Sequence, residues 1–552
     1  MEMSCQARHF RSNGTFMKTV IFALNSSYSH TSLAARAIAQ GMERYGLEYE
    51  IIEKNQKDKR GTILVSLIEA EADIYGFSTY IWNVEDMLSY ASSVKKILPE
   101  AKIVFGGPEV AFRGEEFLLE HGFVDYLIRG EGEEAFPKLC KQIFVGETTE
   151  RIIDAPYFKD FTESGIYYGE VGAIPHGLVY YESVRGCPFS CTYCLSSTEK
   201  RIRAKSAERA LEDLKGFERF DDIKTVKFVD RTFNFDKERA KKMWRGLCTD
   251  EYTKEYHFEI CASLLDDESV EILTHAPRGK FRIEIGLQST NPKTLEAINR
   301  KLNVAETIAR TKQLYEAGNL FVHLDLIAGL PYEDYATFGK SFNDSYGVCD
   351  ELQLGFLKIL CGCEMEKDAE RYGIIYADKP PYQVLKTDFI SFAELEKLSL
   401  TDELCERFSN SGNFKKTFPW LPLRYGNAFE FFERFGEFFE QKHGTRDISK
   451  ISQANAFLLV LDFAKSIMND VTEVKARLAL DFLFGETRKL PSEIAEGIIA
   501  EGRTKEELLA AVPRADRASC EAVKLPFISD RYIIVNRKNK TLTETEVVYN
   551  GL

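Results

Sequence analysis

The 552-residue sequence has no long apolar run and no excess of positive charge. None of its apolar runs reaches the ~18 residues that a membrane-spanning helix requires, and the longest candidate, Ala454 to Met468, is interrupted by Asp462 and Lys465. The formal net charge is −14. Nucleic-acid binding generally needs a basic surface that displaces phosphate counterions. We therefore expect neither a membrane nor a nucleic acid as a general partner.

A secretory signal and a regular disulfide framework are also absent. The twelve cysteines are scattered along the chain, which is typical of a protein in a reducing compartment. The sequence thus predicts a cytoplasmic location. Residues 1–16 are polar and without periodicity, and we expect them to form a disordered extension.

Three cysteines follow one another closely in the middle of the chain. Cys187, Cys191 and Cys194 are spaced by four and three residues, after the apolar run Leu178 to Tyr181. A structural zinc site would need four ligands, but the nearest further cysteines lie roughly fifty residues away. Three thiolates from one loop suit an iron-sulfur cluster. A zinc knuckle, a disulfide and a chance spacing are the alternatives.

This spacing, with Tyr193 just before the last cysteine, resembles the signature of the radical S-adenosylmethionine (SAM) superfamily. The resemblance implies a 4Fe-4S cluster on Cys187, Cys191 and Cys194, with a fourth iron that binds SAM. It further implies that one electron cleaves SAM to methionine and a 5′-deoxyadenosyl radical. A partner such as flavodoxin or ferredoxin would supply that electron. Tyr193 matches the aromatic residue whose backbone reaches the adenine.

The segment 17–146 alternates short apolar runs with helical stretches. Its predicted elements are strands at 19–24, 74–78, 103–105 and 126–128, and helices at 33–45 and 84–98. Such alternation is typical of a doubly wound parallel sheet, which binds ligands outside the carboxyl ends of its strands. Glycines and small polar residues follow these strands. We therefore expect their loops to line one site.

The order Phe-Gly-Gly-Pro-Glu and then Arg-Gly-Glu-Gly-Glu before the cysteine loop is similar to the cobalamin-binding domain that precedes many radical SAM barrels. The resemblance implies cobalamin contacts from Asn25, Ser26, Ser78, Tyr80, Gly106, Gly107, Glu109, Gly130, Glu131 and Gly132. The Asp-x-His-x-x-Gly element that supplies a histidine below cobalt elsewhere is absent. His30 is out of that frame, so we expect it to begin a helix or to touch the edge of the corrin. A doubly wound module with a nucleotide or no ligand is the alternative.

From residue 178 a regular strand-helix repeat predicts a partial (β/α)6 barrel, with its chemistry at the carboxyl ends of the strands. The expected strands are 178–184, 225–229, 257–261, 281–287, 321–327 and 352–357. Resemblance to radical SAM barrels implies SAM contacts from Tyr193, Arg203, Asp230, Glu284, Gln288 and Ile327. For each polar member of this set, a salt bridge at the barrel rim is the alternative. Cys361 and Cys363 follow the sixth strand and are candidate catalytic residues, although buried cysteines are more often inert.

The fold class predicted is therefore α/β: a Rossmann-like cobalamin-binding domain (17–146), a linker (147–175), a radical SAM partial TIM barrel (176–387) and a mainly helical C-terminal domain (388–552). The last domain should end in a β-hairpin of 531–535 and 541–549, and the stripe of Phe431, Phe435, Phe438 and Phe439 should be core.

The leading hypothesis for function is a cobalamin-dependent radical SAM methyltransferase that methylates an unactivated carbon of a small molecule or peptide through methylcobalamin. Radical ring contraction or oxidative cyclisation without methyl transfer is one alternative, and a non-catalytic corrinoid-binding protein is another. A methylthiotransferase is disfavoured, because its amino-terminal domain should carry a further cysteine trio and 17–146 contains only Cys140.

Overall fold

The computed structural model describes residues 17–28, 30–147, 149–164, 177–485, 489–525 and 531–546. The predicted extension 1–16 and part of the predicted linker lie outside these ranges. The chain divides into two compact units. The first holds Met1–Gly286, Leu295–Val322 and Phe356–Asp388, and the second holds Leu287–Thr294, His323–Gly355 and Phe389–Leu552. No helix within the described ranges combines the length and apolar character needed to cross a bilayer.

The first unit begins with a six-stranded parallel sheet in the order β2-β1-β3-β4-β5-β6. The strands are β1 (Thr19–Asn25), β2 (Tyr49–Asn55), β3 (Ile74–Ser78), β4 (Lys102–Gly106), β5 (Tyr126–Arg129) and β6 (Ile152–Asp154). The strand order reverses between β1 and β3, which is the point where doubly wound sheets bind their ligands.

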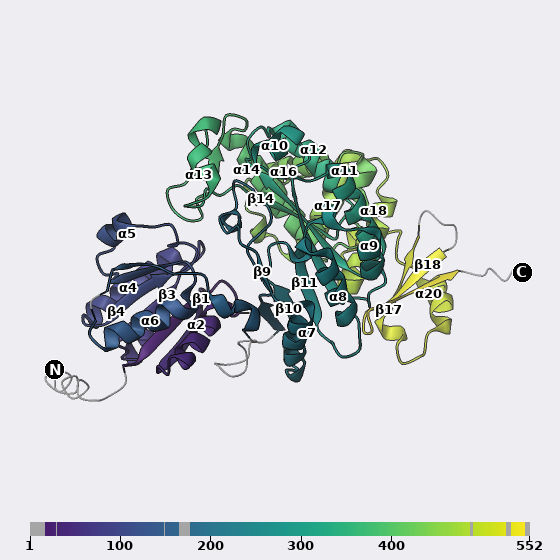
Figure 1. The fold of residues 1–552 in the computed structure, drawn as a ribbon. Coiled ribbons are helices and arrows are strands. Elements are labelled where there is room, and N and C mark those ends of the chain that lie inside the picture. Colours follow the sequence, from purple (N-terminus) through teal and green to yellow (C-terminus); the bar gives the residue numbers. More distant parts are fainter. Residues whose placement is uncertain are drawn as a thin grey trace, which may run out of the picture. The chain divides into compact units, whose positions relative to one another are not determined.

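Helices cover both faces of this sheet (Figure 1). They are α2 (Leu33–Arg44), α3 (Arg60–Glu69), α4 (Val84–Ile97), α5 (Glu115–Glu120) and α6 (Gly132–Phe144). One core joins the strands to α3, α4 and α5, and a second core joins them to α2 and α6. Strand side chains alternate between these cores, because successive residues of a strand point to opposite faces. The prediction of a doubly wound domain is confirmed.

Two strands of this sheet were missed by the sequence analysis. β2 (Tyr-Glu-Ile-Ile-Glu-Lys-Asn) mixes polar and apolar residues without a regular alternation and is only partly buried, as expected of an edge strand. β6 is three residues long and lies inside the segment predicted to be a linker. Short edge strands carry a weak sequence signal, since one neighbour and little burial suffice to hold them.

The second sheet is a parallel half-barrel in the order β14-β13-β12-β11-β10-β7. Its strands are β7 (Gly177–Tyr181), β10 (Ile223–Phe228), β11 (Glu255–Ile260), β12 (Phe281–Gln288), β13 (Phe321–Ala328) and β14 (Glu351–Phe356). The intervening helices are α7 (Ala207–Lys215), α8 (Lys237–Leu247), α9 (Asp267–Thr274), α10 (Pro292–Ala297), α11 (Val304–Glu316) and α12 (Tyr335–Ser345). The predicted partial barrel is confirmed, except that its first strand stops before Glu182.

The short pair β8 (Val184–Arg185) and β9 (Arg203–Ala204) flanks the cysteine loop. After β14 the chain forms α13 (Glu364–Asp368) and the pair β15 (Ile375–Tyr376) and β16 (Val384–Lys386), all within the first unit.

The rest of the second unit is mainly helical. Its helices are α14 (Phe392–Leu404), α15 (Leu421–Tyr425), α16 (Ala428–His443), α17 (Gln453–Ile467), α18 (Thr472–Gly485), α19 (Ser492–Ala495) and α20 (Gly502–Leu508). Phe431, Phe435 and Phe439 on α16 are buried and pack against other aromatic rings, while Phe438 is partly buried. The aromatic stripe is therefore core, as predicted.

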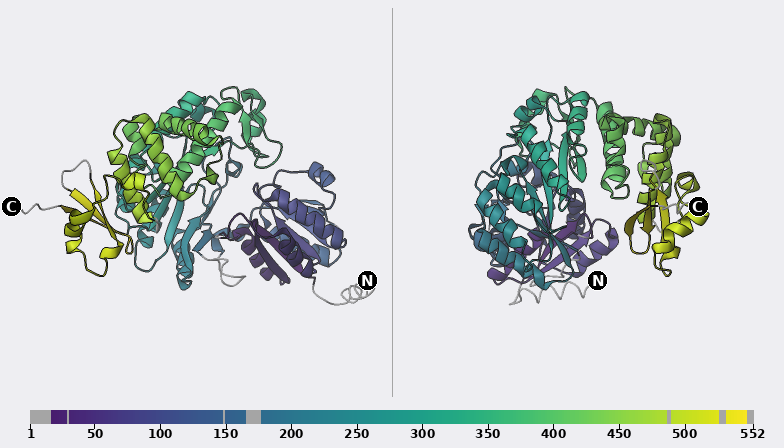
Figure 2. Two further views of the ribbon diagram at one scale, coloured as in Figure 1. Left: turned by 180° about the vertical axis from the view of Figure 1, so that it is seen from behind. Right: turned by 90° about the vertical axis from the view of Figure 1, so that its right-hand side faces the viewer.

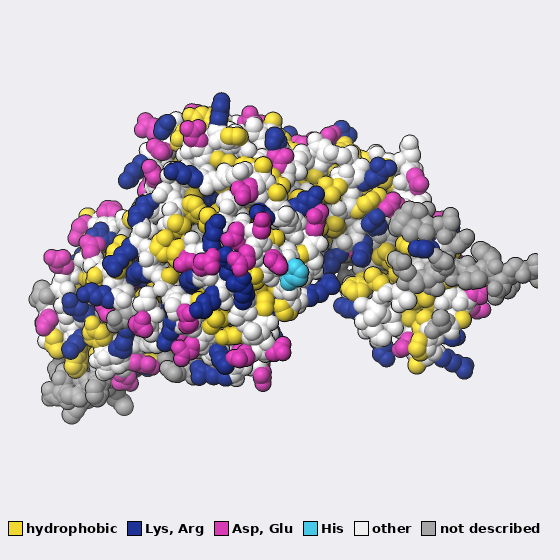
Figure 3. Space-filling view, turned by 45° about the vertical axis from the view of Figure 1, so that its right-hand side comes forward, with side chains coloured by type: hydrophobic (Ala, Val, Ile, Leu, Met, Phe, Trp, Pro, Cys, Tyr) yellow, Lys and Arg dark blue, Asp and Glu magenta, His cyan; other side chains and the backbone are white. Residues whose placement is uncertain are grey.

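The chain ends in an antiparallel sheet of β17 (Cys520–Lys524), β18 (Arg531–Asn536) and β19 (Thr541–Glu546), drawn in yellow in Figure 2. The predicted hairpin corresponds to β18 and β19, and β17 adds a third strand that the sequence analysis missed. On the face drawn in Figure 3, acidic and basic side chains are interspersed rather than gathered by sign. That face offers no broad basic area of the kind that nucleic acids favour.

Candidate functional site

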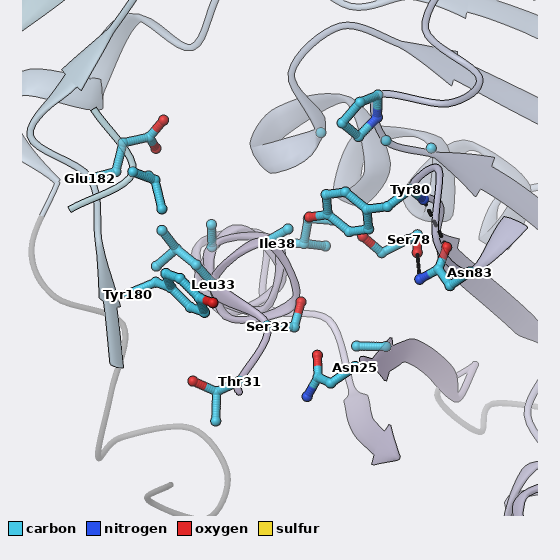
Figure 4. Close-up of a pocket in the computed structure, with 18 of the residues that line it drawn as sticks. Asn25, Thr31, Ser32, Leu33, Ile38, Ser78, Tyr80, Asn83, Tyr180 and Glu182 are labelled. Atoms are coloured by element: carbon cyan, nitrogen blue, oxygen red, sulfur yellow. Dashed lines mark hydrogen bonds between the residues drawn. The ribbon is translucent and has the colours of Figure 1, made fainter. Parts of the chain in front are cut away.

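A cavity of about 760 Å³ lies within the first unit. On one side it is bordered by the carboxyl ends of β1, β3, β4 and β5, and on the other by residues of β7, β10, β11 and β12. Figure 4 shows side chains of both groups around the same space, with Tyr180 and Glu182 facing α2 and the β3 loop. The cavity thus joins the switch point of the first sheet to the strands of the half-barrel.

Asn83 ties together the loops that follow β1 and β3. Its Nδ2 donates to the carbonyl oxygens of Leu24 (3.1 Å) and Ser78 (3.3 Å), and its Oδ1 accepts from the backbone N–H of Tyr80 (2.8 Å). Figure 4 marks two of these bonds. Asn83 is 1% exposed. Sequence reasoning missed this residue, because it starts a helix and does not end a strand.

Gly107 allows the β4 loop to lie against the β3 loop. Its φ is +112°, and a Cβ atom there would come within 2.4 Å of the Thr79 carbonyl oxygen. Thr79 in turn donates from its backbone N–H (2.7 Å) and Oγ1 (2.8 Å) to the Gly106 carbonyl. Only glycine fits such a conformation and approach without strain.

Most of the predicted cobalamin residues line this cavity. The lining includes Asn25, Ser26, Ser78, Tyr80, Gly106, Gly107, Gly130, Glu131 and Gly132. Glu109 is not among the lining residues. It contacts Arg113 (3.4 Å) and accepts a hydrogen bond from Tyr382, because Pro108 turns the chain away from the strand end.

His30 also reaches the cavity, and it contacts the barrel. Its Nδ1 lies 3.3 Å from the Tyr180 hydroxyl and 3.4 Å from Ser26 Oγ. Burial and the nearby Lys227 lower the pKa of His30, which favours a neutral ring. Two residues later, Ser32 caps α2. The expectation that His30 lies next to a helix start agrees with this position.

The barrel side of the cavity carries charged residues that sequence reasoning largely missed. They are Glu182, Arg185, Lys227, Arg231, Glu259 and Glu284, and only Glu284 was a predicted site residue. Glu284 Oε2 lies 3.1 Å from Lys227 Nζ and 3.1 Å from His257 Nε2. Alternation along β10, β11 and β12 could have identified Lys227, Glu259 and Glu284 as inward-facing.

The cysteine loop is held by hydrogen bonds to its backbone from two other segments, at Ile298–Asn299 and at Met365. Thr192 N donates to the Ile298 carbonyl (3.1 Å), Met365 N donates to the Thr192 carbonyl (2.8 Å), and Asn299 Nδ2 donates to the Ser190 carbonyl (3.0 Å). Gly186, at φ +87°, lies so close to the Arg201 carbonyl that a Cβ atom would be 2.6 Å from its oxygen. Tertiary contacts therefore set the shape of this loop.

The three thiols are free and are spread more widely than a single ion would require. Cys187, Cys191 and Cys194 form no disulfide. Among the described residues, the only group whose ligand atoms all lie within 4.8 Å of one another is Glu238, Asp266 and Glu268, and Lys241 already pairs with all three. A cluster that gives each cysteine its own iron suits the trio better than a zinc ion does.

Arg300 is a basic residue next to the trio that the sequence analysis did not select. Its Nη1 lies 3.5 Å from Cys191 Sγ, and its Nη2 donates to the Gly286 carbonyl at the end of β12. Burial opposes its charge, but Tyr193 and Cys191 raise the pKa of Arg300. Its buried Nε has no hydrogen-bond partner among the described residues. Arg300 follows the helix α10, whereas the sequence analysis selected residues at the ends of strands.

Asp230 is fully buried, at 0% exposure. It accepts hydrogen bonds from the backbone N–H groups of Ser183 (2.7 Å) and Val184 (2.9 Å) and from the Ser183 hydroxyl. Burial raises the pKa of Asp230 to about 6. The carboxylate thus fastens the chain just before the cysteine loop.

The remaining predicted SAM residues differ in environment. Arg203 is 9% exposed, and its guanidinium contacts Glu131 and the Phe158 carbonyl (3.2 Å). Burial raises the pKa of Tyr193. In the second unit, Gln288 has φ +73° and its buried Oε1 accepts no hydrogen bond from the described residues, while Ile327 is partly buried on β13.

Cys361 and Cys363 do not line the cavity. Cys363 is 0% exposed and precedes α13. Cys361 is partly exposed, and burial raises the pKa of both thiols. These surroundings favour the thiol form at neutral pH, which is the less reactive form. A catalytic role for either cysteine remains a prediction.

Family models match three consecutive regions of the chain. Residues 19–140 match the B12 binding domain, residues 181–344 match the Radical SAM superfamily, and residues 370–519 match a protein family of unknown function, DUF4080. The chain thus contains a B12-binding domain followed by a radical SAM domain. Both domains meet in the cavity described above, and the cysteine trio lies within the radical SAM match.

Relatives with the same two domains are similar over part of this radical SAM protein. The cobalamin-dependent radical SAM methyltransferase TokK from Streptomyces tokunonensis is 28% identical over 359 residues, which cover 56% of this chain and 51% of TokK. The chain therefore matches about half the length of that relative.

Two solved structures share the fold. The radical SAM methyltransferase TsrM from Kitasatospora setae, with cobalamin and a 4Fe-4S cluster bound, superimposes with a TM-score of 0.54 at 15% identity, covering 66% of this chain and 79% of TsrM. The cobalamin-dependent SAM radical enzyme OxsB, with aqua-cobalamin bound, has a TM-score of 0.55 at 15% identity. The match covers 87% of this chain and 82% of OxsB. At these identities the likeness shows the fold alone.

The residues of this radical SAM protein fit the cofactors that its domains imply. For a corrinoid, the cavity offers apolar walls such as Ile21, Ala23 and Val104, with small residues at the strand ends. For a cluster, the cysteine loop offers three free thiols, one of them beside a buried cation. For SAM, Arg300 Nε is a buried polar atom without a partner among the described residues. Native proteins rarely leave such atoms unsatisfied without a reason.

Proposed function

We propose that this protein is a cobalamin-dependent radical SAM methyltransferase that methylates an unactivated carbon. The observation that carries the proposal is the single cavity bounded both by the switch point of the B12-binding domain and by the inner strands of the radical SAM half-barrel. When bound, the cluster with SAM supplies a 5′-deoxyadenosyl radical and cobalamin supplies a methyl group. The sequence similarity to TokK, which is named as such a methyltransferase, supports this choice.

We assign the cluster to Cys187, Cys191 and Cys194. Their loop is fixed by backbone hydrogen bonds at Ser190 and Thr192. Asp230 holds the segment before the loop through Ser183 and Val184. Such rigid support keeps the ligands of a reactive centre in one geometry.

For SAM, Arg300 provides a buried cation next to Cys191, suited to a carboxylate group. In the second unit, Gln288 has a buried amide oxygen without a partner among the described residues, and such an oxygen can accept from a hydroxyl or ammonium donor. Tyr193 contributes backbone at the end of the loop. Glu284 contacts Lys227 and His257, and these contacts orient its carboxylate on the cavity wall.

The cobalamin would lie along the strand ends of the first sheet. Ser26, Ser78, Gly106 and Gly107 leave room for close approach to the backbone. The neutral His30 ring is held by Tyr180 and Ser26, so we assign it to the edge of the site rather than to cobalt. Apolar walls exclude water from this region, which protects a radical from side reactions.

The substrate is proposed to be a small molecule or a peptide, and the electron donor a flavodoxin or ferredoxin in a reducing cytoplasm. A further solved structure of TsrM holds tryptophan as substrate together with a SAM analogue. The fold shared with that enzyme makes the same cavity the place to look for the substrate of this chain.

The proposal is tested by anaerobic reconstitution with iron, sulfide and hydroxocobalamin, followed by reduction in the presence of SAM. Mass analysis then measures 5′-deoxyadenosine, S-adenosylhomocysteine and methylcobalamin. We expect all three from the native chain and no 5′-deoxyadenosine from Cys191→Ala. Cys248→Ala removes a cysteine outside the trio and serves as the matched control.

Two other results would redirect the assignment. If 5′-deoxyadenosine forms without methylcobalamin, the protein performs radical chemistry without methyl transfer, such as a ring contraction or a cyclisation. If Cys191→Ala forms as much 5′-deoxyadenosine as the native chain, the trio is not the reactive centre. If the native chain retains hydroxocobalamin but forms no 5′-deoxyadenosine, a non-catalytic corrinoid-binding role takes its place.

A further inference from the structure

The cysteine loop begins and ends on a two-residue antiparallel ribbon. β8 pairs with β9, and Arg185 lies directly opposite Arg203 in the register. All three cysteines lie between these arginines in the sequence. Two like charges opposite each other on a ribbon repel one another, so the base of the loop needs an anion to hold it together.

Glu131 is the carboxylate that contacts both arginines. Its Oε2 lies 3.0 Å from Arg185 Nη1 and 3.0 Å from Arg203 Nη1, and its Oε1 contacts Arg203 Nη2. The backbone N–H of Phe158 donates to the same Oε2 at 2.6 Å. The exposed fractions are 17% for the Glu131 side chain, 12% for Arg185 and 9% for Arg203. Without Glu131, Arg203 keeps only a more distant carboxylate among the described residues, Glu199 at 3.7 Å, so the charge of this buried set is less well compensated.

The neighbouring carboxylates of the described residues contact one of the two arginines each. Glu133 contacts Arg185, and Glu182 accepts from Arg185 Nε at 3.0 Å. Aromatic rings support the guanidinium groups: Phe161 lies 4.6 Å from Arg185, and Tyr157 lies 4.9 Å from Arg203. Glu131 differs from these other carboxylates, since its charge bridges the two arms of the ribbon.

The same glutamate belongs to the wall of the cavity. Gly130, Glu131, Gly132 and Glu133 all line it, and Glu131 directly precedes α6. One short loop of the B12-binding domain therefore borders the proposed cobalamin site and also fixes the base of the cysteine loop. Any ligand that orders this loop will also restrict the ribbon.

We propose that Glu131 is a positioning residue that couples cobalamin binding to the order of the cysteine loop. The inference rests on the proposed function, because it takes a corrinoid as the ligand of the cavity. The ion pair between Arg203 and Glu131 links the two cofactor sites. Arg203 lies at the base of the cysteine loop, and Glu131 lines the cavity. Coupling of this kind is reciprocal: an assembled cluster tightens cobalamin binding by the same factor by which cobalamin favours cluster assembly.

The first test needs no cobalamin. Native chain and Glu131→Gln are reconstituted with iron and sulfide, and the rate of iron release to a ferrous chelator is followed. We expect Glu131→Gln to release iron about tenfold faster. Asp154→Asn is the matched control, because Asp154 binds Arg129 in a similar two-bond pair (2.7 and 2.6 Å) but is 75% exposed and touches neither the ribbon nor the cavity. It should release iron at close to the native rate.

The second test measures the dissociation constant of hydroxocobalamin with and without the cluster. We expect the native chain to bind about tenfold more tightly when the cluster is assembled, and Glu131→Gln to reduce this ratio to below about twofold. Glu131→Asp, which keeps the charge, should restore part of the ratio. The proposal would be overturned if the native chain binds hydroxocobalamin equally tightly with and without the cluster. It would also be overturned if Glu131→Gln releases iron at the rate of the native chain and shows the same ratio of dissociation constants.

The two tests separate this inference from the proposed function. If hydroxocobalamin binds in neither state, the cobalamin part of the proposed function fails and the coupling fails with it, whatever the iron-release rates. If hydroxocobalamin binds but the ratio is one, only the coupling fails. Should Glu131→Gln not fold, as judged by circular dichroism, Arg203→Gln breaks the same contact from the other side and is measured in the same way.

Discussion

Arg300 Nη1 lies 3.5 Å from the Sγ of Cys191, and the other end of its guanidinium donates to the Gly286 carbonyl at the end of β12. The contact joins residues 109 positions apart. It places a buried cation at the cysteine loop, and the neighbouring Tyr193 and Cys191 help to keep it charged.

Replacing Arg300 should impair SAM binding. We expect Arg300→Gln to raise the dissociation constant for SAM by about tenfold or more, since a charge-assisted hydrogen bond to a carboxylate is lost. Titration of the reconstituted protein with SAM, followed by the change in the cluster's electron paramagnetic resonance signal, measures this. Arg310→Gln is the control, because Arg310 pairs with Asp267 on the surface. An unchanged affinity in Arg300→Gln would argue against a role in SAM binding.

Replacing Gly107 should disturb the cobalamin site. A Cβ atom at this position would meet the Thr79 carbonyl at 2.4 Å, and φ is +112°. We expect Gly107→Ala to destabilise the fold by about 1–3 kcal/mol and to weaken hydroxocobalamin binding at least about tenfold. Gly122→Ala, where a Cβ atom meets nothing within 4 Å, should leave both quantities unchanged. Thermal unfolding and absorbance titration provide the measurements, and native affinity in Gly107→Ala would contradict the placement.

Replacing Asp402 should remove a pH dependence of stability in the second unit. Burial raises the pKa of Asp402 to about 7, and its buried Oδ1 has no hydrogen-bond partner among the described residues. An unfolded aspartate ionises near pH 4. Between about pH 4 and 7 the folded chain therefore binds a proton that the unfolded chain has released, and stability falls as the pH rises through this window.

Replacing Asp402 by a residue that cannot ionise should therefore stabilise the protein at high pH but not at low pH. We expect Asp402→Asn to raise Tm by about 2–4 °C at pH 8 and by less than about 1 °C at pH 4. Glu396→Gln, on the exposed side of the same helix, should change Tm little at either pH. Equal shifts of Tm at both values of pH would show that ionisation of Asp402 is not the cause.

Replacing Cys361 or Cys363 should have little effect. Neither residue lines the cavity, and burial raises the pKa of both thiols. We expect Cys361→Ser and Cys363→Ala to form 5′-deoxyadenosine within about twofold of the native rate, because an un-ionised thiol outside the site takes no part in the reaction. A large loss in a folded Cys361→Ser protein would instead restore this cysteine as a catalytic candidate.

Strand positions were largely predictable, because a buried parallel strand leaves a short apolar run bounded by glycine or polar residues. β1, β3 and β12 were each located to within two residues. β2, β6 and β17 were missed, since partly exposed or very short strands do not carry that pattern. Glu109 was expected to contact cobalamin because it follows β4 in the sequence. In the structure the chain turns at Pro108, and the Glu109 side chain contacts Arg113 and Tyr382.

Local sequence determined the cysteine loop, the glycine-bearing strand ends and the two successive α/β domains of this protein, because each depends on residues that are neighbours in the chain. Tertiary structure alone decided the partners of Glu131, Arg203 and Arg300. Their contacts join residues from 14 to 109 positions apart, and no pattern in a single segment encodes which charges will meet. The reason is physical: a charge finds its partner only after the strands that carry both have been placed by packing.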